Sequence, residues 1–133
     1  VQRLDMHELH EDARRFDSGV YNLAGICALG ASIDLLLEAG IPEVQVRVKQ
    51  LTDLMVEGLR SKGWQVHSPR TASEWSGIVS FSSRKHDTDR VRKHLREEFK
   101  IVAAKRLGRL RASPHYYNST DEIRQLVEAL PPG

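Results

Sequence analysis

The chain has 133 residues, with 20 basic against 18 acidic residues, a formal net charge of +2 and a single cysteine. This length suits one domain that buries a core without disulfides or metals, and one cysteine excludes a disulfide framework. The near balance of charge requires no polyanionic partner. No apolar run is long enough to cross a bilayer and no signal peptide is recognisable, so we expect a cytoplasmic protein without a membrane partner. Because the chain starts at Val1 and not at methionine, we expect a fragment of a longer protein.

Residues 1–21 carry mixed charge with few apolar anchors. We expect them to form an arm or linker that another part of a larger protein holds in place. His7 and His10 lie beside acidic residues in this segment. A short pair of histidines without a clear third ligand is weak support for metal binding, so we predict no metal site.

Residues 22–39 are apolar nearly all round a helix, and small residues keep one flank narrow. A helix without a clear polar face must be buried on more than one side. One small domain does not supply so much cover, so this helix predicts a partner surface on another domain or another subunit. Cys27 lies among its apolar residues, where we expect a small buried hydrophobe and not a reactive thiol.

The rest of the chain alternates helices and strands. Gly40 ends the first helix and Pro42 begins the next, which runs to about Lys62 with one apolar stripe. The predicted elements that follow are strands at 64–66 and 77–82, a helix at 87–98, strands at 101–104 and 107–113, and a last helix after the capping box at 119–122. This order predicts an α+β domain over residues 22–133, with a small, largely antiparallel sheet and helices packed on one face.

The densest basic stretch, residues 84–96, is interleaved with acidic residues. A solvated helix face explains that pattern better than a nucleic-acid groove. An RNA-binding domain is a third and weaker interpretation, because the aromatic residues are not gathered on one strand face. We therefore predict no nucleic-acid partner.

An arginine stands within the apolar strand near the end of the chain. Strand alternation places Leu110 and Ala112 on one face, and Arg109, Arg111 and Ser113 on the other. The apolar face can pack while a guanidinium is offered on the far side, where it suits a carboxylate bound by two hydrogen bonds. Arg111 is therefore the candidate substrate-binding residue.

Two nearby residues are candidates for a supporting role. His115 invites a general-base role because imidazole titrates near neutrality, but we interpret it chiefly as a turn residue that can hydrogen-bond beside the site. Asn118 is interpreted as shaping the turn before the last helix. Both rank below Arg111.

Two blocks of this sequence resemble one family. Residues 110–118, followed by 119–123 and a short apolar helix, look like the C-terminal end of class V aminotransferases, the pyridoxal-phosphate enzymes that include cysteine desulfurases, kynureninase and isopenicillin epimerase-like proteins. Residues 15–22, running into 24–31, are similar to the stretch where that family leaves its large domain and enters a long helix. The blocks come in the family's order, and the resemblance covers about residues 15–130.

The resemblance implies that residues 22–133 form the C-terminal small domain of a fold-type I pyridoxal-phosphate enzyme. The full-length protein would act on an amino-acid substrate as a homodimer, and Arg111 matches the family arginine that holds the substrate α-carboxylate. The family's cofactor lysine lies on the N-terminal large domain, which is missing here. No lysine-centred cofactor motif is recognisable in this chain, so we expect no catalytic residue in it and no activity of the fragment alone.

Gly19 and Val20 match the position where family members commonly have glycine and threonine, which reach the cofactor phosphate across the dimer interface. The valine lacks the threonine hydroxyl, so only backbone contacts are expected here, and Tyr21 replaces the usual proline. Tyr21 could contact the phosphate through its phenol, although an interface aromatic is the better interpretation.

The same resemblance separates reaction classes. Cysteine desulfurases carry a nucleophilic cysteine on a loop shortly before the carboxylate arginine, whereas residues 103–110 hold no cysteine and leave no room for a mobile loop. An aminotransferase, lyase or epimerase is therefore favoured over a desulfurase of that mechanism. The rival from another class is a non-catalytic α+β module that binds a protein partner through its apolar first helix.

Overall fold

The computed structural model describes residues 11–16 and 19–133. Its elements are η1 (Ala13–Phe16), α1 (Leu23–Ala39), α2 (Ile41–Ser61), β1 (Gln65–Val66), β2 (Val79–Ser82), α3 (Thr88–Phe99), β3 (Ala104–Arg106), β4 (Arg109–Ala112) and α4 (Thr120–Ala129). The order of helices and strands from α1 onward is the predicted one. The chain divides into two compact units, Val1–Leu35 and Leu36–Gly133, and each is described by itself. The expected division into an arm (1–21) and a domain (22–133) stays a prediction.

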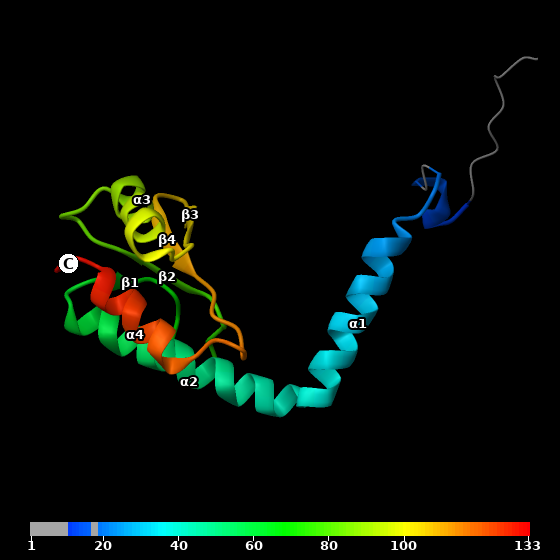
Figure 1. Cartoon of the computed structure of the whole chain (residues 1–133), viewed down its shortest axis with the longest axis horizontal. Coiled ribbons are helices and arrows are strands. Elements are labelled where there is room, and N and C mark those ends of the chain that lie inside the picture. Colours follow the sequence, from blue (N-terminus) through cyan, green and yellow to red (C-terminus); the bar gives the residue numbers. More distant parts are fainter. Residues whose placement is uncertain (1–10, 17–18) are drawn as a thin grey trace, which may run out of the picture. The chain divides into compact units, whose positions relative to one another are not determined.

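The second unit contains a four-stranded antiparallel sheet in the order β1-β2-β4-β3 (Figure 1). Alternate residues of its two central strands are buried: Val79 and Phe81 in β2, and Leu110 and Ala112 in β4. They share one apolar core with residues of α2, α3 and α4, so these helices cover one face of the sheet. The predicted α+β class with helices on one face is confirmed.

The helices of this unit pack through the stripes that their sequences predict. In α2 the stripe buries Leu51, Met55 and Leu59, and Gly58 lies against α4, where an added Cβ would come within 2.8 Å of both Val127 methyl carbons. Two predicted caps are confirmed. Asp87 accepts a hydrogen bond from the Arg90 amide at the start of α3, and the complete capping box begins α4.

Asn22 precedes helix α1 and caps its first turn, because its Oδ1 accepts a hydrogen bond from the Gly25 amide at 2.9 Å. The helix has no buried residue. The expectation that Cys27 is buried is therefore wrong for this chain, because Cys27 is exposed. Its apolar neighbours are exposed as well. The described residues therefore provide no apolar cover that would bury Cys27.

The strand boundaries near residue 105 differ from the prediction. The predicted strand at 101–104 is wrong in all but its last residue, because the Ile101 amide donates to Leu95 O at 2.9 Å and closes the end of α3 instead of joining a ladder. The strand predicted at 107–113 begins only at Arg109, because Leu107 (φ 50°) and Gly108 (φ 74°) form a two-residue turn with both φ angles positive. The strands β3 and β4 thus form a tight hairpin, which agrees with the expectation that residues 103–110 leave no room for a mobile loop.

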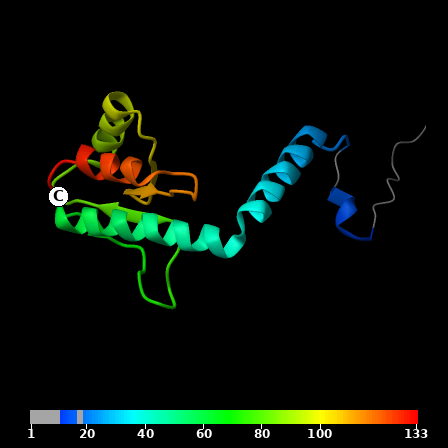
Figure 2. The same ribbon diagram turned by 60° about the horizontal axis from the view of Figure 1, so that its bottom comes forward.

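The loop between β1 and β2 makes a long excursion beside α2 (Figure 2). Arg70 anchors it, with only 8% of its side chain exposed. Its guanidinium donates to Ser76 O and Thr52 Oγ1 at 3.1 and 3.0 Å and forms an ion pair with Asp53. The Trp75 ring centre lies 5.9 Å from the Arg70 guanidinium carbon, so the loop is held from two sides.

No described helix is by itself both long and apolar enough to span a membrane. Only α1 and α2 taken together would reach that length and composition.

Candidate functional site

Arg111 extends from β4, one of the two central strands. In the strand register it lies directly opposite Ser80 of β2 and Ala104 of β3. Its sequence neighbours Leu110 and Ala112 point into the helix-covered core, so alternation directs Arg111 to the opposite face of the sheet, which α2, α3 and α4 do not cover and which we call the uncovered face. The residue is half-buried, and its Nε is buried without a hydrogen-bond partner among the described residues.

The turn after β4 is built around Asn118. Its side-chain Oδ1 accepts a hydrogen bond from the His115 backbone amide at 2.8 Å, and its backbone amide donates to His115 O at 3.0 Å. Arg47 of α2 donates to Asn118 O at 3.0 Å, which fastens the turn to a neighbouring helix. Asn118 therefore stabilises this turn. Its side-chain Nδ2 also donates a hydrogen bond to Glu122 Oε2 at 3.2 Å, which links the turn to the cap of α4.

The Glu122 carboxylate accepts hydrogen bonds from this turn. The Ser119 amide donates to Glu122 Oε2 at 2.7 Å, and this bond, with a smaller contribution from Asn118, lowers the pKa of the Glu122 carboxyl below its ordinary value. The carboxylate therefore stays charged where it completes the cap.

His115 packs in an aromatic cluster with the two tyrosines that follow it. Its ring stacks on Tyr117 with centroids 4.8 Å apart and meets Tyr116 edge-on at 5.0 Å. Its Nδ1 is buried and has no hydrogen-bond partner among the described residues. Arg111 and His115 thus contribute the two orphaned buried side-chain atoms found in the described part of the chain, within one short segment.

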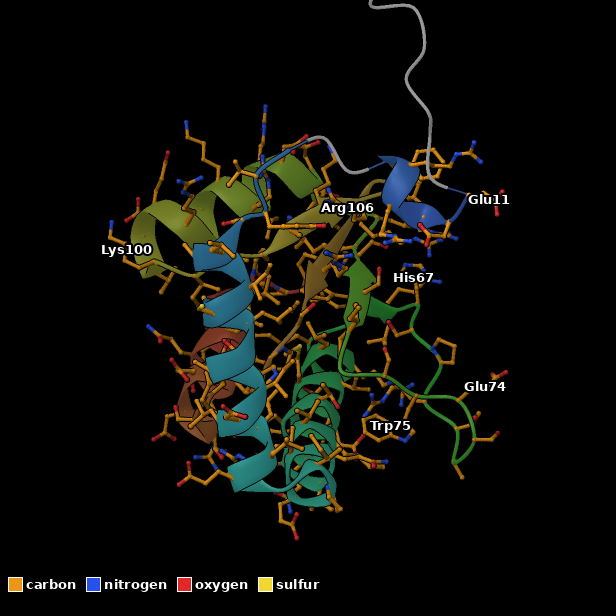
Figure 3. The ribbon with its side chains drawn as sticks, turned by 90° about the vertical axis from the view of Figure 1, so that its right-hand side faces the viewer. Glu11, His67, Glu74, Trp75, Lys100 and Arg106 are labelled. Atoms are coloured by element: carbon orange, nitrogen blue, oxygen red, sulfur yellow. The ribbon has the colours of Figure 1, made fainter. Side chains whose placement is uncertain are left out.

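The uncovered face brings Arg109 together with polar residues that the sequence did not single out. Arg106 lies opposite Arg109 in the β3–β4 register, and His67 Nε2 is 2.8 Å from Ser82 Oγ (Figure 3, in which Arg106 and His67 are labelled). Burial, with a smaller contribution from the charge of Arg109, lowers the pKa of the His67 imidazole. Strand alternation in the sequence already places Arg109 on the same face as Arg111. That Arg106 lies opposite Arg109 follows only from the strand register.

Gly19 and Val20 belong to the other compact unit, in the segment before α1. Gly19 adopts a positive φ of 124°, and Val20 is 98% exposed. His7 and His10 lie outside the described residues. Within the described ranges no group of three or more histidine, cysteine or acidic side chains could hold a metal ion.

A family model matches most of this sequence. The model described as aminotransferase class-V matches residues 1–126, almost the whole chain. The chain belongs to the class V aminotransferase family. Members of this family are pyridoxal-phosphate-dependent enzymes.

Curated relatives point to the same family. The chain is 31% identical to a probable cysteine desulfurase of Methanothermobacter thermautotrophicus over 95% of its length, and 29% identical to another of Pyrococcus abyssi over 93%. It is 25% identical to the uncharacterized aminotransferase YcbU of Bacillus subtilis over 89%. The chain spans only 35%, 34% and 31% of these relatives, about a third of their length.

Solved structures show the same fold. The apo structure of a cysteine desulfurase from Thermococcus onnurineus NA1 matches with a TM-score of 0.81 and 25% identity, over 95% of this chain and 34% of that one. A structure titled NIFS-like protein matches with a TM-score of 0.71 and 19% identity, over 84% of this chain and 33% of that one. The small antiparallel sheet with its helices is therefore a fold shared with fold-type I pyridoxal-phosphate enzymes.

Proposed function

We propose that this chain is the C-terminal small domain of a pyridoxal-phosphate enzyme, and that Arg111 binds the α-carboxylate of its amino-acid substrate. One observation carries the proposal: Arg111 extends from a central strand onto the uncovered face, and its Nε is buried without a partner. A buried donor without an acceptor has lost hydration and gained nothing in return. A substrate carboxylate supplies that acceptor and can accept two parallel hydrogen bonds from the guanidinium.

The role of Arg111 in this proposal is orientation. Fixing the carboxylate at one point limits how the substrate can turn, and holding a reactant in its productive geometry lowers the barrier. Pyridoxal phosphate, when bound, supplies an electron sink for chemistry at the substrate Cα. In our proposal the cofactor lysine belongs to the N-terminal large domain, and the 133-residue chain alone is inactive.

The chain's own contact to the cofactor is proposed at Gly19 and Val20. Their backbone amides are the groups that remain after the family threonine is replaced by valine, and Val20 is almost fully exposed. In a homodimer these amides would face the phosphate group bound to the second copy.

The reaction class is proposed from the hairpin before Arg111. Two curated relatives are named probable cysteine desulfurases. In this chain β3 and β4 are joined by Leu107 and Gly108 alone, and the single cysteine lies in α1. We therefore favour transamination, elimination or epimerisation over desulfuration by a cysteine of this hairpin.

A non-catalytic protein-interaction module is the second candidate, because the large apolar side chains of α1 are exposed. Association of the chain that depends on its concentration and is indifferent to pyridoxal phosphate would favour this module.

The test is the visible absorption of the full-length protein with pyridoxal phosphate, recorded before and after addition of L-amino acids. We expect a cofactor band that amino acids perturb, and an Arg111→Ala variant whose band is intact but unresponsive. Arg96→Ala, an exposed arginine on α3, serves as the matched control and should respond as the wild type does. A folded protein without any cofactor band would overturn the enzyme assignment.

A further inference from the structure

The uncovered face of the sheet carries a pair of arginines, Arg106 and Arg109, beside Arg111. Arg106 and Arg109 are directly opposite each other in the β3–β4 register, and alternation places both on the same face as Arg111. Like charges directly opposite on neighbouring strands destabilise a sheet. Both side chains are exposed, and an anion bound between them would offset their repulsion.

No such anion is found in the described part of the chain. None of the ion pairs there involves Arg106, Arg109 or Arg111. Within residues 11–16 and 19–133, the hydrogen bond of the Arg106 side chain is to the neighbouring Lys105 O, at 3.1 Å. Lys105, which precedes Arg106 in β3, behaves differently because it pairs with Asp89 of α3. Charge is thus compensated on the helix-covered side of β3 and left uncompensated on the open side.

The groups around this pair are those that bind anions. Ser82 ends β2. Because Phe81 lies opposite Leu110, the same register continued by one residue places Ser82 opposite Arg109, and the Ser82 hydroxyl is hydrogen-bonded to His67. Together the arginines offer guanidinium forks, with a hydroxyl and an imidazole at their edge. Residues two apart on a strand are about 7 Å apart, so Arg109 and Arg111 can each bind one end of the same small molecule.

We propose that Arg106 and Arg109 form a second anion subsite, and that the substrate is an amino acid whose side chain carries an acidic group. This inference rests on the proposed function of Arg111. Arg111 would bind the α-carboxylate while the Arg106–Arg109 pair binds the side-chain carboxylate or another anionic group. An acidic segment elsewhere in the full-length protein is the competing occupant, and it predicts no preference among free amino acids.

The first measurement is independent of cofactor chemistry. The full-length protein is titrated by calorimetry with glutarate, which has two carboxylates, and with butyrate, which has one. We expect glutarate to bind more tightly, and Arg109→Gln to weaken glutarate binding by about tenfold or more while butyrate binding stays within about twofold. Equal binding of the two acids, or no binding of glutarate, overturns the second subsite.

The second measurement compares L-glutamate with L-glutamine, and L-aspartate with L-asparagine, through the cofactor band. Arg109→Gln and Arg106→Gln should abolish a preference for the acidic member of each pair, and Arg109→Lys should retain part of it because it keeps the charge. Lys105→Gln, which removes a charge from the other side of the same hairpin, should leave the preference unchanged. A wild-type protein without preference, or an effect of Lys105→Gln equal to that of Arg109→Gln, contradicts the proposal.

The two proposals fail differently. If no amino acid perturbs the band but glutarate binding depends on Arg109, the carboxylate role of Arg111 is wrong and the anion subsite stands. If neutral and acidic amino acids perturb the band equally, Arg111 stands and the second subsite is wrong.

Discussion

Arg111 lies directly opposite Ser80 in the antiparallel pairing of β4 with β2, on the face of the sheet opposite the one that α2, α3 and α4 cover. The backbone of the strand is satisfied by its two neighbours, whereas the guanidinium Nε has no partner among the described residues. The sheet therefore fixes the backbone of a positively charged residue at a position that stability alone does not explain. Central strands give such a residue a better fixed position than a loop would.

Arg111→Lys separates charge from geometry at this position. Lysine keeps the positive charge but cannot bind a carboxylate through two parallel hydrogen bonds. In the full-length protein we expect amino-acid affinity to fall for Arg111→Lys, and to fall by about 2–5 kcal/mol for Arg111→Ala if the pair is desolvated. Titration of the cofactor band measures both. Equal affinities for wild type and Arg111→Lys would argue against bidentate binding.

Gly58→Ala tests the packing of α2 on α4. Alanine favours a helix interior over glycine by about 1 kcal/mol. Its Cβ would, however, come within 2.8 Å of the Val127 methyl carbons, and valine is stiff about its first side-chain torsion. We expect a net loss of about 1–3 kcal/mol in the free energy of unfolding of the chain, measured in urea. The double variant Gly58→Ala/Val127→Ala should regain part of it; no recovery would mean that the clash is not with Val127.

Ser119→Ala tests the cap of α4. The Ser119 hydroxyl accepts a hydrogen bond from the Glu122 amide at 3.1 Å, and loss of such a cap costs about 1 kcal/mol. The thermal melt of the chain, followed by circular dichroism, should shift down accordingly. Ser73→Ala, in the exposed β1–β2 loop, is the matched control and should leave the melt unchanged.

Acid should weaken the same cap. The Ser119 amide, with Asn118, holds the pKa of Glu122 below its ordinary value, so the unfolded chain binds this proton at a higher pH than the folded chain does. The stabilisation is therefore complete above the ordinary pKa of a glutamate and is lost as pH falls through the lowered pKa. Urea titrations between about pH 6 and pH 3 should show a smaller loss of stability for Glu122→Gln than for wild type. Parallel pH curves would contradict this linkage.

Arg70→Lys tests the anchoring of the β1–β2 loop. The nearly buried guanidinium holds Ser76 O, Thr52 Oγ1 and the Asp53 carboxylate together, and a lysine cannot reach all three acceptors. We expect a loss of about 1–3 kcal/mol in stability and a red shift in the fluorescence of Trp75 as its ring becomes more exposed (labelled in Figure 3). Lys49→Gln, which removes an exposed partner of the same Asp53, should have a smaller effect.

The sequence by itself determined the identity and order of the elements, the caps at Asp87 and Ser119, and the alternation that separates Arg111 from Leu110 and Ala112. Each depends on residues close together in the chain, where helix and strand periods act directly. Only the tertiary structure decided that Ile101 closes α3 and that Arg106 opposes Arg109. Register depends on the turn at Leu107 and Gly108 and on packing between distant segments, which local periodicity does not encode. The exposure of Cys27 was missed for the same reason, since an apolar helix predicts a cover but does not supply one.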